Sequence, residues 1–244
     1  MPETDWCQRC FEPEHRCWTC CDGGRIRVTE GDRSDPMFGK TVSCPDCRTG
    51  ASENAGRDSE ETFLRRSRIP SRYAVCRVGT WLPANARPRL AAGTFCAAWP
   101  PSKPFLLLSG EKGTGKTHLA CGIAHEVWER HGKVAAFWNV QTLLERYKAS
   151  FDDDTATETE DQINRALDAS PLLILDDFGA HQETKWSGPL LYRIIDTRYA
   201  NGLPLVMTTN AKLTEMPSRI ISRMSDSQIS ELVQFTGSDQ RMQR

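Results

Sequence analysis

Between residues 105 and 210, short apolar runs alternate with longer segments in which apolar residues recur at helical spacing. Short continuous apolar runs are typical of strands buried in a sheet, whereas spacings of three and four residues are typical of amphipathic helices. The alternation favours a parallel sheet covered by helices on both faces, so we expect an α/β fold. The predicted strands are 106–109, 134–139, 171–175 and 203–208, and the predicted helices are 118–130, 142–150, 162–169 and 188–200.

The chain before residue 105 has a different character. Residues 1–50 are rich in cysteine and lack long apolar periodicity, so they cannot build a hydrophobic core alone. Residues 51–61 are small and polar, which is typical of a linker. The prolines that follow predict short, interrupted helices up to residue 104. We therefore expect a cysteine-rich domain over 1–50, a linker and basic lead-in over 51–104, and the α/β domain over 105–244.

The first predicted strand leads into a glycine-rich segment, Gly110-Glu111-Lys112-Gly113-Thr114-Gly115-Lys116-Thr117, that opens a predicted helix. The position of this G-x-x-x-x-G-K-[ST] pattern favours a phosphate-binding loop over a glycine-rich surface turn. Glycines let backbone N–H groups converge on an anion, and the helix N-terminus adds its positive dipole end. We expect Lys116 to reach the β- and γ-phosphates and the Thr117 hydroxyl to ligate Mg²⁺. The residues expected to bind the nucleotide are Gly110, Gly113, Thr114, Gly115, Lys116, Thr117 and His118.

Polar residues follow two of the other predicted strands. The apolar run 172–175 ends in Asp176 and Asp177, a pattern that resembles a Walker B strand. We expect Asp176 to hold Mg²⁺ through water and Asp177 to polarise the attacking water. Asn210 follows the next strand and fits a residue that orients water against the γ-phosphate. Carboxyl ends of parallel strands meet at one edge of a sheet, so we expect these groups to lie together. Taken singly, each also fits an ordinary turn after a strand.

Three arginines complete the candidate nucleotide site. Arg219 and Arg223 lie four residues apart, so they share one face of a predicted helix. An arginine that reaches the γ-phosphate of a neighbouring subunit would stabilise charge during phosphoryl transfer. We expect Arg223 in that role with Arg219 beside it, the alternative being two surface arginines. Arg241, close to the last residue, is placed to fold back on the nucleotide.

Seven of the ten cysteines lie before residue 50, and six of the seven form three C-x-x-C pairs. In a reducing compartment such a cluster indicates metal rather than disulfides. We expect zinc to be bound by two of the pairs, since strand-like runs between them predict a hairpin that brings them together. Cys7 and Cys10 either form a second site with His15 or Cys21 or are spare, and free thiols are the alternative for the main set. The expected zinc ligands are Cys17, Cys20, Cys44 and Cys47.

The charge distribution is uneven although the net charge is only −1. From residue 62 to 110 there is no acidic residue, and this span carries seven arginines and one lysine. A basic face can bind a polyanion such as DNA, whereas an arginine-rich linker is the alternative. No apolar run approaches the roughly 20 residues of a membrane span, and the N-terminus lacks a secretory signal pattern, so we expect a cytoplasmic protein without a membrane partner. The isolated cysteines Cys76, Cys96 and Cys121 are expected to be buried.

These motifs together resemble the AAA+ replicative helicase loaders of the DnaC/DnaI type, in versions close to those of phages and mobile elements. The similarity covers 110–117, 172–179, 208–210, 218–224 and 237–241, and residues 17–24 resemble the zinc knuckle of that family. The resemblance implies an AAA+ P-loop core that binds ATP with Mg²⁺ and single-stranded DNA, and that assembles into an open ring or spiral. It also implies that the Zn²⁺ domain binds a DnaB-type replicative helicase hexamer, which is loaded onto single-stranded DNA when replication starts or restarts. Arg223 resembles the finger of that family, and Arg241 its second sensor arginine.

Two departures from the family pattern affect the expected activity. Asp177 stands where many AAA+ proteins have a longer glutamate, so we expect slow or partner-stimulated hydrolysis. The sequence ends three residues after Arg241, so we expect little helical lid and a nucleotide affinity that depends on neighbouring subunits. Two alternatives stay open. One is an IstB-type transposition helper ATPase, against which the cysteine-rich N-terminus argues. The other is a zinc-containing DNA-binding regulator with a nucleotide switch.

Overall fold

The computed structural model describes residues 25–27, 41–43, 60–81, 86–151, 158–179, 186–237 and 239. The chain divides into two compact units, Met1–Ser59 and Glu60–Arg244. In the first unit, β1 (Arg25–Arg27) and β2 (Thr41–Ser43) form an antiparallel pair. This pair confirms the hairpin predicted between the two cysteine pairs that are expected to bind zinc, whose cysteines lie outside the described residues. The second unit begins at residue 60, so the described residues of 60–104 belong to the same unit as the α/β core.

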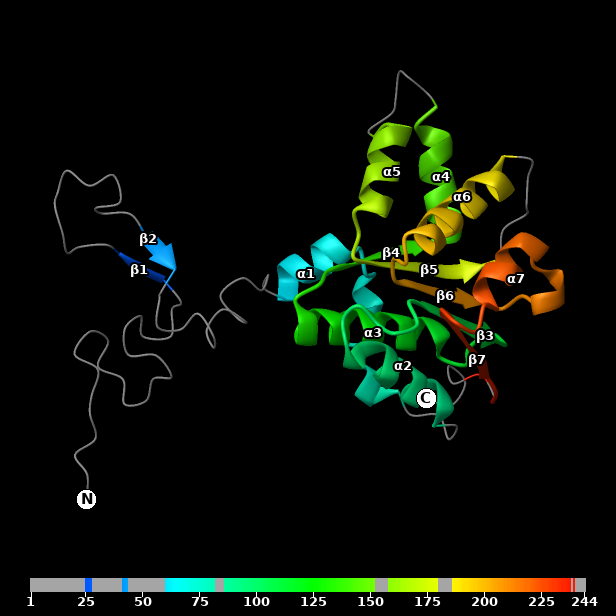
Figure 1. Cartoon of the computed structure of the whole chain (residues 1–244), viewed down its shortest axis with the longest axis horizontal. Coiled ribbons are helices and arrows are strands. Elements are labelled where there is room, and N and C mark those ends of the chain that lie inside the picture. Colours follow the sequence, from blue (N-terminus) through cyan, green and yellow to red (C-terminus); the bar gives the residue numbers. More distant parts are fainter. Residues whose placement is uncertain are drawn as a thin grey trace. The chain divides into compact units, whose positions relative to one another are not determined.

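Five strands of the second unit form a parallel sheet in the order β4-β5-β6-β3-β7 (Figure 1). Four of them lie close to the predicted apolar runs, which confirms the α/β class. The fifth, β7, pairs with β3 at one edge and was not predicted, because Glu231 and Gln234 interrupt its apolar residues. The strands are β3 (Phe105–Gly110), β4 (Ala135–Asn139), β5 (Leu172–Phe178), β6 (Leu205–Thr209) and β7 (Ser230–Phe235).

Helices follow the strands as the spacing predicts, and their starts are set by polar caps. The Asn139 side chain accepts hydrogen bonds from the N–H groups of Gln141 and Thr142, which fixes the first turn after β4. Thr159 and Gln162 form a capping box at the start of the next helix. The core helices are α3 (Lys116–His131), α4 (Val140–Ala149), α5 (Glu160–Asp168), α6 (Ser187–Ala200) and α7 (Ser218–Met224), with the 3-10 turn η4 (Leu213–Glu215) before α7.

The proline-containing stretch before β3 forms short helices, as predicted. It contains α1 (Glu60–Ser67), η2 (Ser71–Tyr73), η3 (Val78–Thr80) and α2 (Arg87–Ala97). These elements are packed on the sheet rather than separate from it, because Phe63, Trp81 and Phe95 are buried in one cluster with strand residues. No helix in the described part of the chain is long and apolar enough to cross a membrane.

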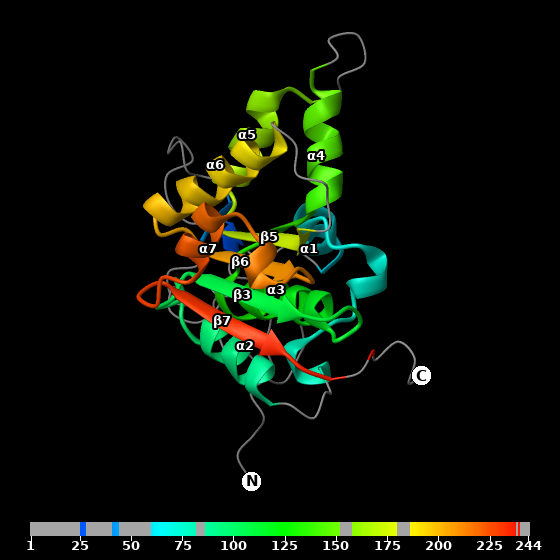
Figure 2. The ribbon, with the colours of Figure 1, turned by 90° about the vertical axis from the view of Figure 1, so that its right-hand side faces the viewer.

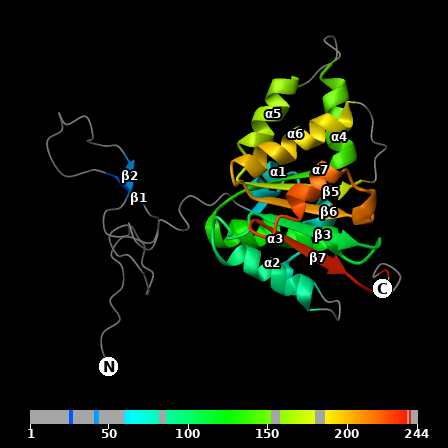
Figure 3. The same ribbon diagram turned by 45° about the vertical axis from the view of Figure 1, so that its right-hand side comes forward.

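Alternate residues of each strand face two separate cores. Leu106 and Leu108 of β3 pack with α1, α2 and α3, whereas Phe105 and Leu107 pack with the layer of α4 to α7. Figures 2 and 3 show α2 and α3 on one face of the sheet and α4 to α7 on the other. Because both faces are covered, the inner strands are apolar throughout, which explains their continuous hydrophobic runs. Cys76, Cys96 and Cys121 are buried in the first core, as predicted.

Candidate nucleotide site

The glycine-rich loop joins the end of β3 to the start of α3. Gly113 and Gly115 have φ angles of +78° and +91°, which residues with a side chain rarely adopt, so the loop needs glycine at both positions. Lys116 folds back over the loop, and its Nζ donates to the carbonyl oxygens of Gly110 at 2.8 Å and Glu111 at 2.6 Å. Lys116 is only 6% exposed, so its ammonium group lies within the loop, where a phosphate would meet it.

Asp176 and Asp177 lie at a β-bulge between β5 and β6. Leu175 pairs with Met207 and Phe178 pairs with Thr209, so the two acids together face a single residue of β6, Thr208. The Thr208 hydroxyl accepts the N–H of Asp177 at 2.9 Å and donates to Oδ1 of Asp176 at 2.8 Å. One hydroxyl group therefore fixes the backbone of one acid and the carboxylate of the other.

Asp176 links this bulge to the phosphate loop. The Thr117 hydroxyl donates to Oδ1 of Asp176 at 2.8 Å. Burial raises the pKa of the Asp176 carboxyl above its usual value, against the hydrogen bonds from Thr208 and Thr117 that lower it. A desolvated carboxylate next to a hydroxyl oxygen is the kind of hard oxygen donor set that Mg²⁺ prefers. The residues present therefore fit Mg²⁺, with Thr117 and Asp176 as the groups that would hold it.

Asp177 is oriented by Asn210. The Asp177 backbone has a φ of +59°, which is uncommon for a residue with a side chain and clusters at functional sites. The Asn210 amide donates from Nδ2 to Oδ1 of Asp177 at 2.5 Å. The structure thus brings together Lys116, Thr117, Asp176, Asp177 and Asn210 at the carboxyl ends of β3, β5 and β6, where the sequence placed them.

The arginines of α7 do not join this cluster within one subunit. Nε of Arg223 donates to Oδ1 of Asp196 at 3.0 Å, and its guanidinium lies 4.6 Å from the centroid of the Tyr199 ring. Arg219 lies over the ring of Tyr192, also on α6. Other predicted site residues lie outside the described part of the chain: Arg241 and the cysteines Cys17, Cys20, Cys44 and Cys47.

Three residues near the loop were not predicted as part of the site. Thr208 carried a signal, since it is a hydroxyl residue at the end of the strand that precedes Asn210. Asp239 lies in the segment 237–241, of which only Arg241 was assigned to the site, and Trp81 lies in a segment without a pattern. A Cβ placed on Gly113 would lie 2.0 Å from Cγ of Asp239, so the side-chain carboxylate of Asp239 lies against the loop. A Cβ on Gly115 would lie 2.6 Å from the indole nitrogen of Trp81.

The profile of one protein family, described as IstB-like ATP binding protein, matches residues 52–229 of this chain. The chain belongs to the IstB-like ATP-binding protein family. The carboxyl ends of β3, β5 and β6, with the phosphate loop and Lys116, are therefore the candidate ATP-binding edge of this IstB-like protein.

Two curated relatives extend the comparison of this IstB-like protein. The Replicative helicase loader DnaC of Escherichia coli (strain K12) is 31% identical over 120 residues, which span 49% of this chain and 48% of the loader. The match thus covers about half the length of that relative. The Uncharacterized protein YdaV of Escherichia coli (strain K12) is 30% identical over 172 residues, or 68% of each chain.

A solved structure shares the fold of this IstB-like protein. The crystal structure of the DnaC helicase loader aligns with a TM-score of 0.61 and 24% identity, over 68% of this chain and 100% of that chain. At this identity the likeness concerns the fold alone, a parallel sheet between two helix layers.

Proposed function

We propose that this IstB-like protein is an ATPase that loads a replicative DNA helicase onto single-stranded DNA. The observation that carries the proposal is the hydrogen-bonded path from Thr117 through Asp176 to Thr208, which joins the phosphate loop to both acids. Similarity to a protein named as a replicative helicase loader supports the proposal that the ATP is used to load a helicase. The initiation or restart of replication is the process in which such a loader acts.

In the proposed mechanism, Lys116 exchanges the carbonyl oxygens of Gly110 and Glu111 for oxygens of the β- and γ-phosphates. Mg²⁺, when bound, neutralises charge on the phosphates next to Thr117 and Asp176. Asp177 accepts a hydrogen bond from the attacking water, and Asn210 keeps the Asp177 carboxylate in place. Because aspartate is one methylene shorter than glutamate, hydrolysis is slow until a partner brings the water closer.

The nucleotide assignment is tested by replacing Lys116. Lys116→Ala removes a charge-assisted phosphate contact, so ATP affinity should fall roughly 10- to 100-fold in a direct binding measurement. Lys112→Ala is the matched control, because Lys112 is an exposed lysine of the same loop. Wild-type ATP affinity in Lys116→Ala would show that the phosphate loop is assigned wrongly.

The partner assignment concerns the first unit. We propose that Cys17, Cys20, Cys44 and Cys47 bind Zn²⁺ around the β1–β2 hairpin and that this unit contacts a DnaB-type helicase hexamer. A variant lacking residues 1–59, cut at the boundary between the units, should retain ATP binding and lose co-purification with the helicase. Elemental analysis of the full chain should find at least one zinc per chain. Equal helicase binding by the shortened chain would contradict this division of roles.

Single-stranded DNA binding is supported by an aromatic pair, an exposed Phe151 against a half-buried Trp186. Phe151, after α4, is 61% exposed and makes an edge-to-face contact with Trp186, over whose ring Lys148 Nζ lies at 5.6 Å. Exposed aromatic rings beside cations are typical of stacking sites for unpaired bases. Phe151→Ala should weaken binding of a labelled oligonucleotide, whereas Leu90→Ala, which removes another exposed apolar side chain, should not. The basic span 65–89 stays a second candidate, although Arg77 is already paired with Glu60 and Glu129.

A transposition helper ATPase is the second candidate function, and the match to the IstB-like family profile favours it. Both functions need the same nucleotide site, so only the partner separates them. Affinity purification of the full chain from its native host, followed by mass spectrometry, should recover a hexameric helicase. Recovery of a transposase would support the helper function, and sequence-specific duplex binding without ATP turnover would support a regulator.

A further inference from the structure

A buried indole N–H group lies against the phosphate loop. Trp81 is 4% exposed, and its Nε1 has no hydrogen-bond partner within the described residues. The position that a Cβ of Gly115 would occupy lies 2.6 Å from this nitrogen, so the donor is directly beside the loop. Buried donors in folded proteins are nearly always paired, and those that are not call for an explanation such as a ligand.

The ring of Trp81 is held in place by the end of β7. It makes an edge-to-face contact with Phe235, with 5.5 Å between the ring centroids and an interplanar angle of 82°. Phe235 in turn lies against the first glycine of the loop, since a Cβ on Gly110 would lie 2.5 Å from the Phe235 carbonyl oxygen. Trp81 is therefore packed between β7 and the loop, which fixes the direction of its N–H group.

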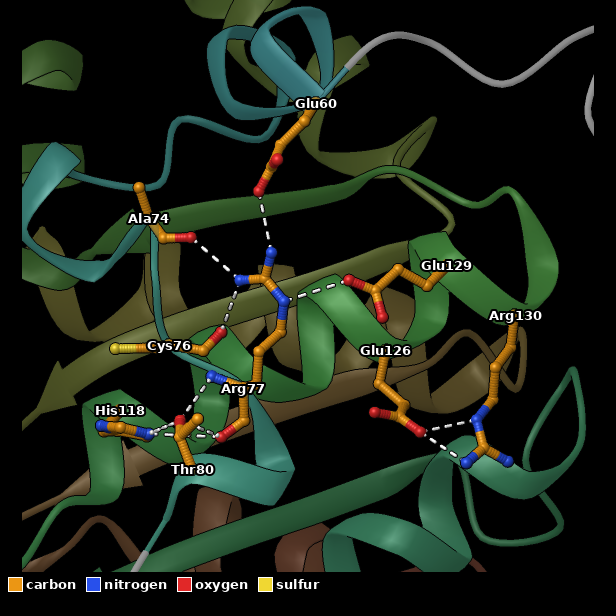
Figure 4. Close-up of polar contacts among 9 residues, drawn as sticks. All are labelled: Glu60, Ala74, Cys76, Arg77, Thr80, His118, Glu126, Glu129 and Arg130. Atoms are coloured by element: carbon orange, nitrogen blue, oxygen red, sulfur yellow. Dashed lines mark hydrogen bonds and ion pairs between the residues drawn. The ribbon is translucent and has the colours of Figure 1, made fainter.

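The residues just before Trp81 are fixed on the first turns of α3 (Figure 4). Nε2 of His118 lies 3.1 Å from the Thr80 hydroxyl and 3.3 Å from the Arg77 carbonyl oxygen. The backbone of this segment approaches α3 so closely that a Cβ on Gly122 would lie 2.7 Å from the nitrogen of Val78. The segment that carries Trp81 is thus packed directly on the helix that begins at Lys116.

The Arg77 side chain also holds the segment that leads to Trp81, through contacts with α1 and α3. Its guanidinium donates to Glu60 on α1 at 2.8 Å and to Glu129 on α3 at 3.0 Å, as Figure 4 shows. It also donates to the carbonyl oxygens of Ala74 at 3.0 Å and Cys76 at 3.1 Å. Four acceptors from three segments hold one side chain, so the backbone leading to Trp81 has a defined course.

The sheet order places Trp81 and the acids on opposite sides of the loop. β3, which carries the loop, lies between β6 and β7. Asp176 and Asp177 lie at the end of β5 and Asn210 follows β6, whereas Phe235 and Trp81 lie on the β7 side. We expect the terminal phosphate of a bound nucleoside triphosphate to lie at Asp176 and Asp177 and its other phosphates to follow the loop. The nucleoside then lies on the side of the loop where Trp81 is found.

We propose that the indole N–H of Trp81 donates a hydrogen bond to the nucleoside part of the bound nucleoside triphosphate, at a base nitrogen or a ribose oxygen. The inference rests on the proposed nucleotide function and deepens it, because it names a residue by which the site distinguishes a nucleotide from a bare polyphosphate. His118, which the sequence placed in the nucleotide site, contacts the segment that carries this donor.

The test compares two ligands on the full chain, ATP and inorganic tripolyphosphate, each with Mg²⁺. Trp81→Phe removes the N–H group and keeps an aromatic ring against Phe235. It should bind ATP roughly fivefold to tenfold more weakly than the wild type and bind tripolyphosphate equally well. Trp128→Phe is the matched control. Trp128 also has a buried, unpaired Nε1, but it stacks on Phe63 about three helical turns from Lys116, so its ATP affinity should stay unchanged.

Equal ATP affinity in Trp81→Phe and the wild type would overturn the inference, and so would an equal loss of both ligands, which indicates a damaged loop. A melting curve checks folding, and if Trp81→Phe is unfolded, Trp81→Met, which also lacks a donor, is measured instead under the same criterion. Failure of the proposed function looks different, because the wild type would then bind neither ligand and Lys116→Ala would change nothing.

Discussion

Thr208 connects two residues of the candidate site through a single hydroxyl group. Its Oγ1 accepts the N–H of Asp177 and donates to Oδ1 of Asp176. Thr208 is the β6 residue that lies opposite both acids at the bulge. Without the hydroxyl, a backbone N–H at the bulge would lose its acceptor and Asp176 would keep only the donor of Thr117. An unsatisfied buried polar group costs about 1–3 kcal/mol.

We therefore expect Thr208→Val, which preserves the shape of the side chain, to lower the free energy of unfolding by about 1–2 kcal/mol. We also expect it to slow ATP hydrolysis more than it weakens ATP binding, since the orientation of the acids is lost and the phosphate loop is intact. Urea unfolding and steady-state turnover measure the two effects. Thr208→Ser retains the hydroxyl and should restore both, and full turnover in Thr208→Val would contradict the positioning role.

Two contacts between whole elements hold the layers around the sheet, and the first is between α1 and α3. Phe63 of α1 stacks on Trp128 and makes an edge-to-face contact with His125, at centroid distances of 4.6 and 4.9 Å. His125 is fully buried, and both of its ring nitrogens lack a hydrogen-bond partner in the described residues. Burial, with a smaller contribution from the Arg77 charge, lowers the pKa of His125 from 6.5 to about 4.

This pKa makes the packing of α1 sensitive to acid. Between the two values the unfolded chain binds a proton at His125 that the folded chain does not, so stability falls as the pH falls from 6.5 towards 4. At about pH 5 the loss should be about 2 kcal/mol relative to about pH 7.5. Urea unfolding at both pH values should show a drop that is about 2 kcal/mol larger for the wild type than for His125→Leu. An equal drop in both proteins would contradict the shift.

The second contact between elements is made by Arg198 of α6. Its side chain is 1% exposed, and its guanidinium donates to the carbonyl oxygens of Leu167, Ser170 and Pro204, each at 2.9 Å. These carbonyls belong to the end of α5 and to the segments that enter β5 and β6. One planar cation thus joins three segments through their carbonyl oxygens. The Pro204 oxygen also accepts the N–H of Leu173, and the Leu167 oxygen also accepts the hydroxyl of Ser170.

We expect Arg198→Met to lower the free energy of unfolding by about 2–4 kcal/mol, because three buried carbonyl oxygens lose a charged donor. Arg198→Lys should recover only part of this loss, since an ammonium group cannot span the same acceptors. Chemical denaturation provides the measurement. Arg165→Met changes an exposed arginine of α5 and should stay within about 0.5 kcal/mol of the wild type. A similar effect of both substitutions would argue against the buried network.

Elements whose apolar residues follow a regular period could be predicted from the sequence, and irregular ones could not. The inner strands and α3 to α6 are continuous or periodic, because both faces of the sheet are covered. β7 lies at an edge and carries Glu231 and Gln234, so its pattern is broken. The bulge at Asp176 depends on pairing with β6, and the position of Trp81 depends on its contact with Phe235 of β7. Both are contacts between distant parts of the chain, so the local spacing of apolar residues does not predict them. The motif residues were predictable because each follows a strand end.

At the scale of the whole molecule, we propose that one subunit completes the site of another through Arg223. Arg223 is tied to its own α6 by Asp196 at 3.0 Å, by the Tyr192 hydroxyl at 3.3 Å and by the ring of Tyr199. Partly exposed ion pairs of this kind stabilise a protein only weakly, because solvent screens the charges. A γ-phosphate on a neighbouring subunit therefore needs little free energy to draw the guanidinium away from Asp196, so the observed contact is compatible with a role in trans.

We expect Arg223 to act in trans, and two inactive variants should then restore each other. Lys116→Ala subunits keep the arginine but lose the nucleotide, whereas Arg223→Ala subunits keep the nucleotide but lose the arginine. Each variant alone should hydrolyse little ATP, and their mixture should recover activity at interfaces that pair an intact site with an intact arginine. Turnover measured over mixing ratios at a protein concentration that permits assembly should pass through a maximum. Either of two results would contradict the trans role. One is a mixture that stays as inactive as its components, and the other is a loss of turnover in Arg223→Ala that is as large in dilute subunits as at the concentration that permits assembly.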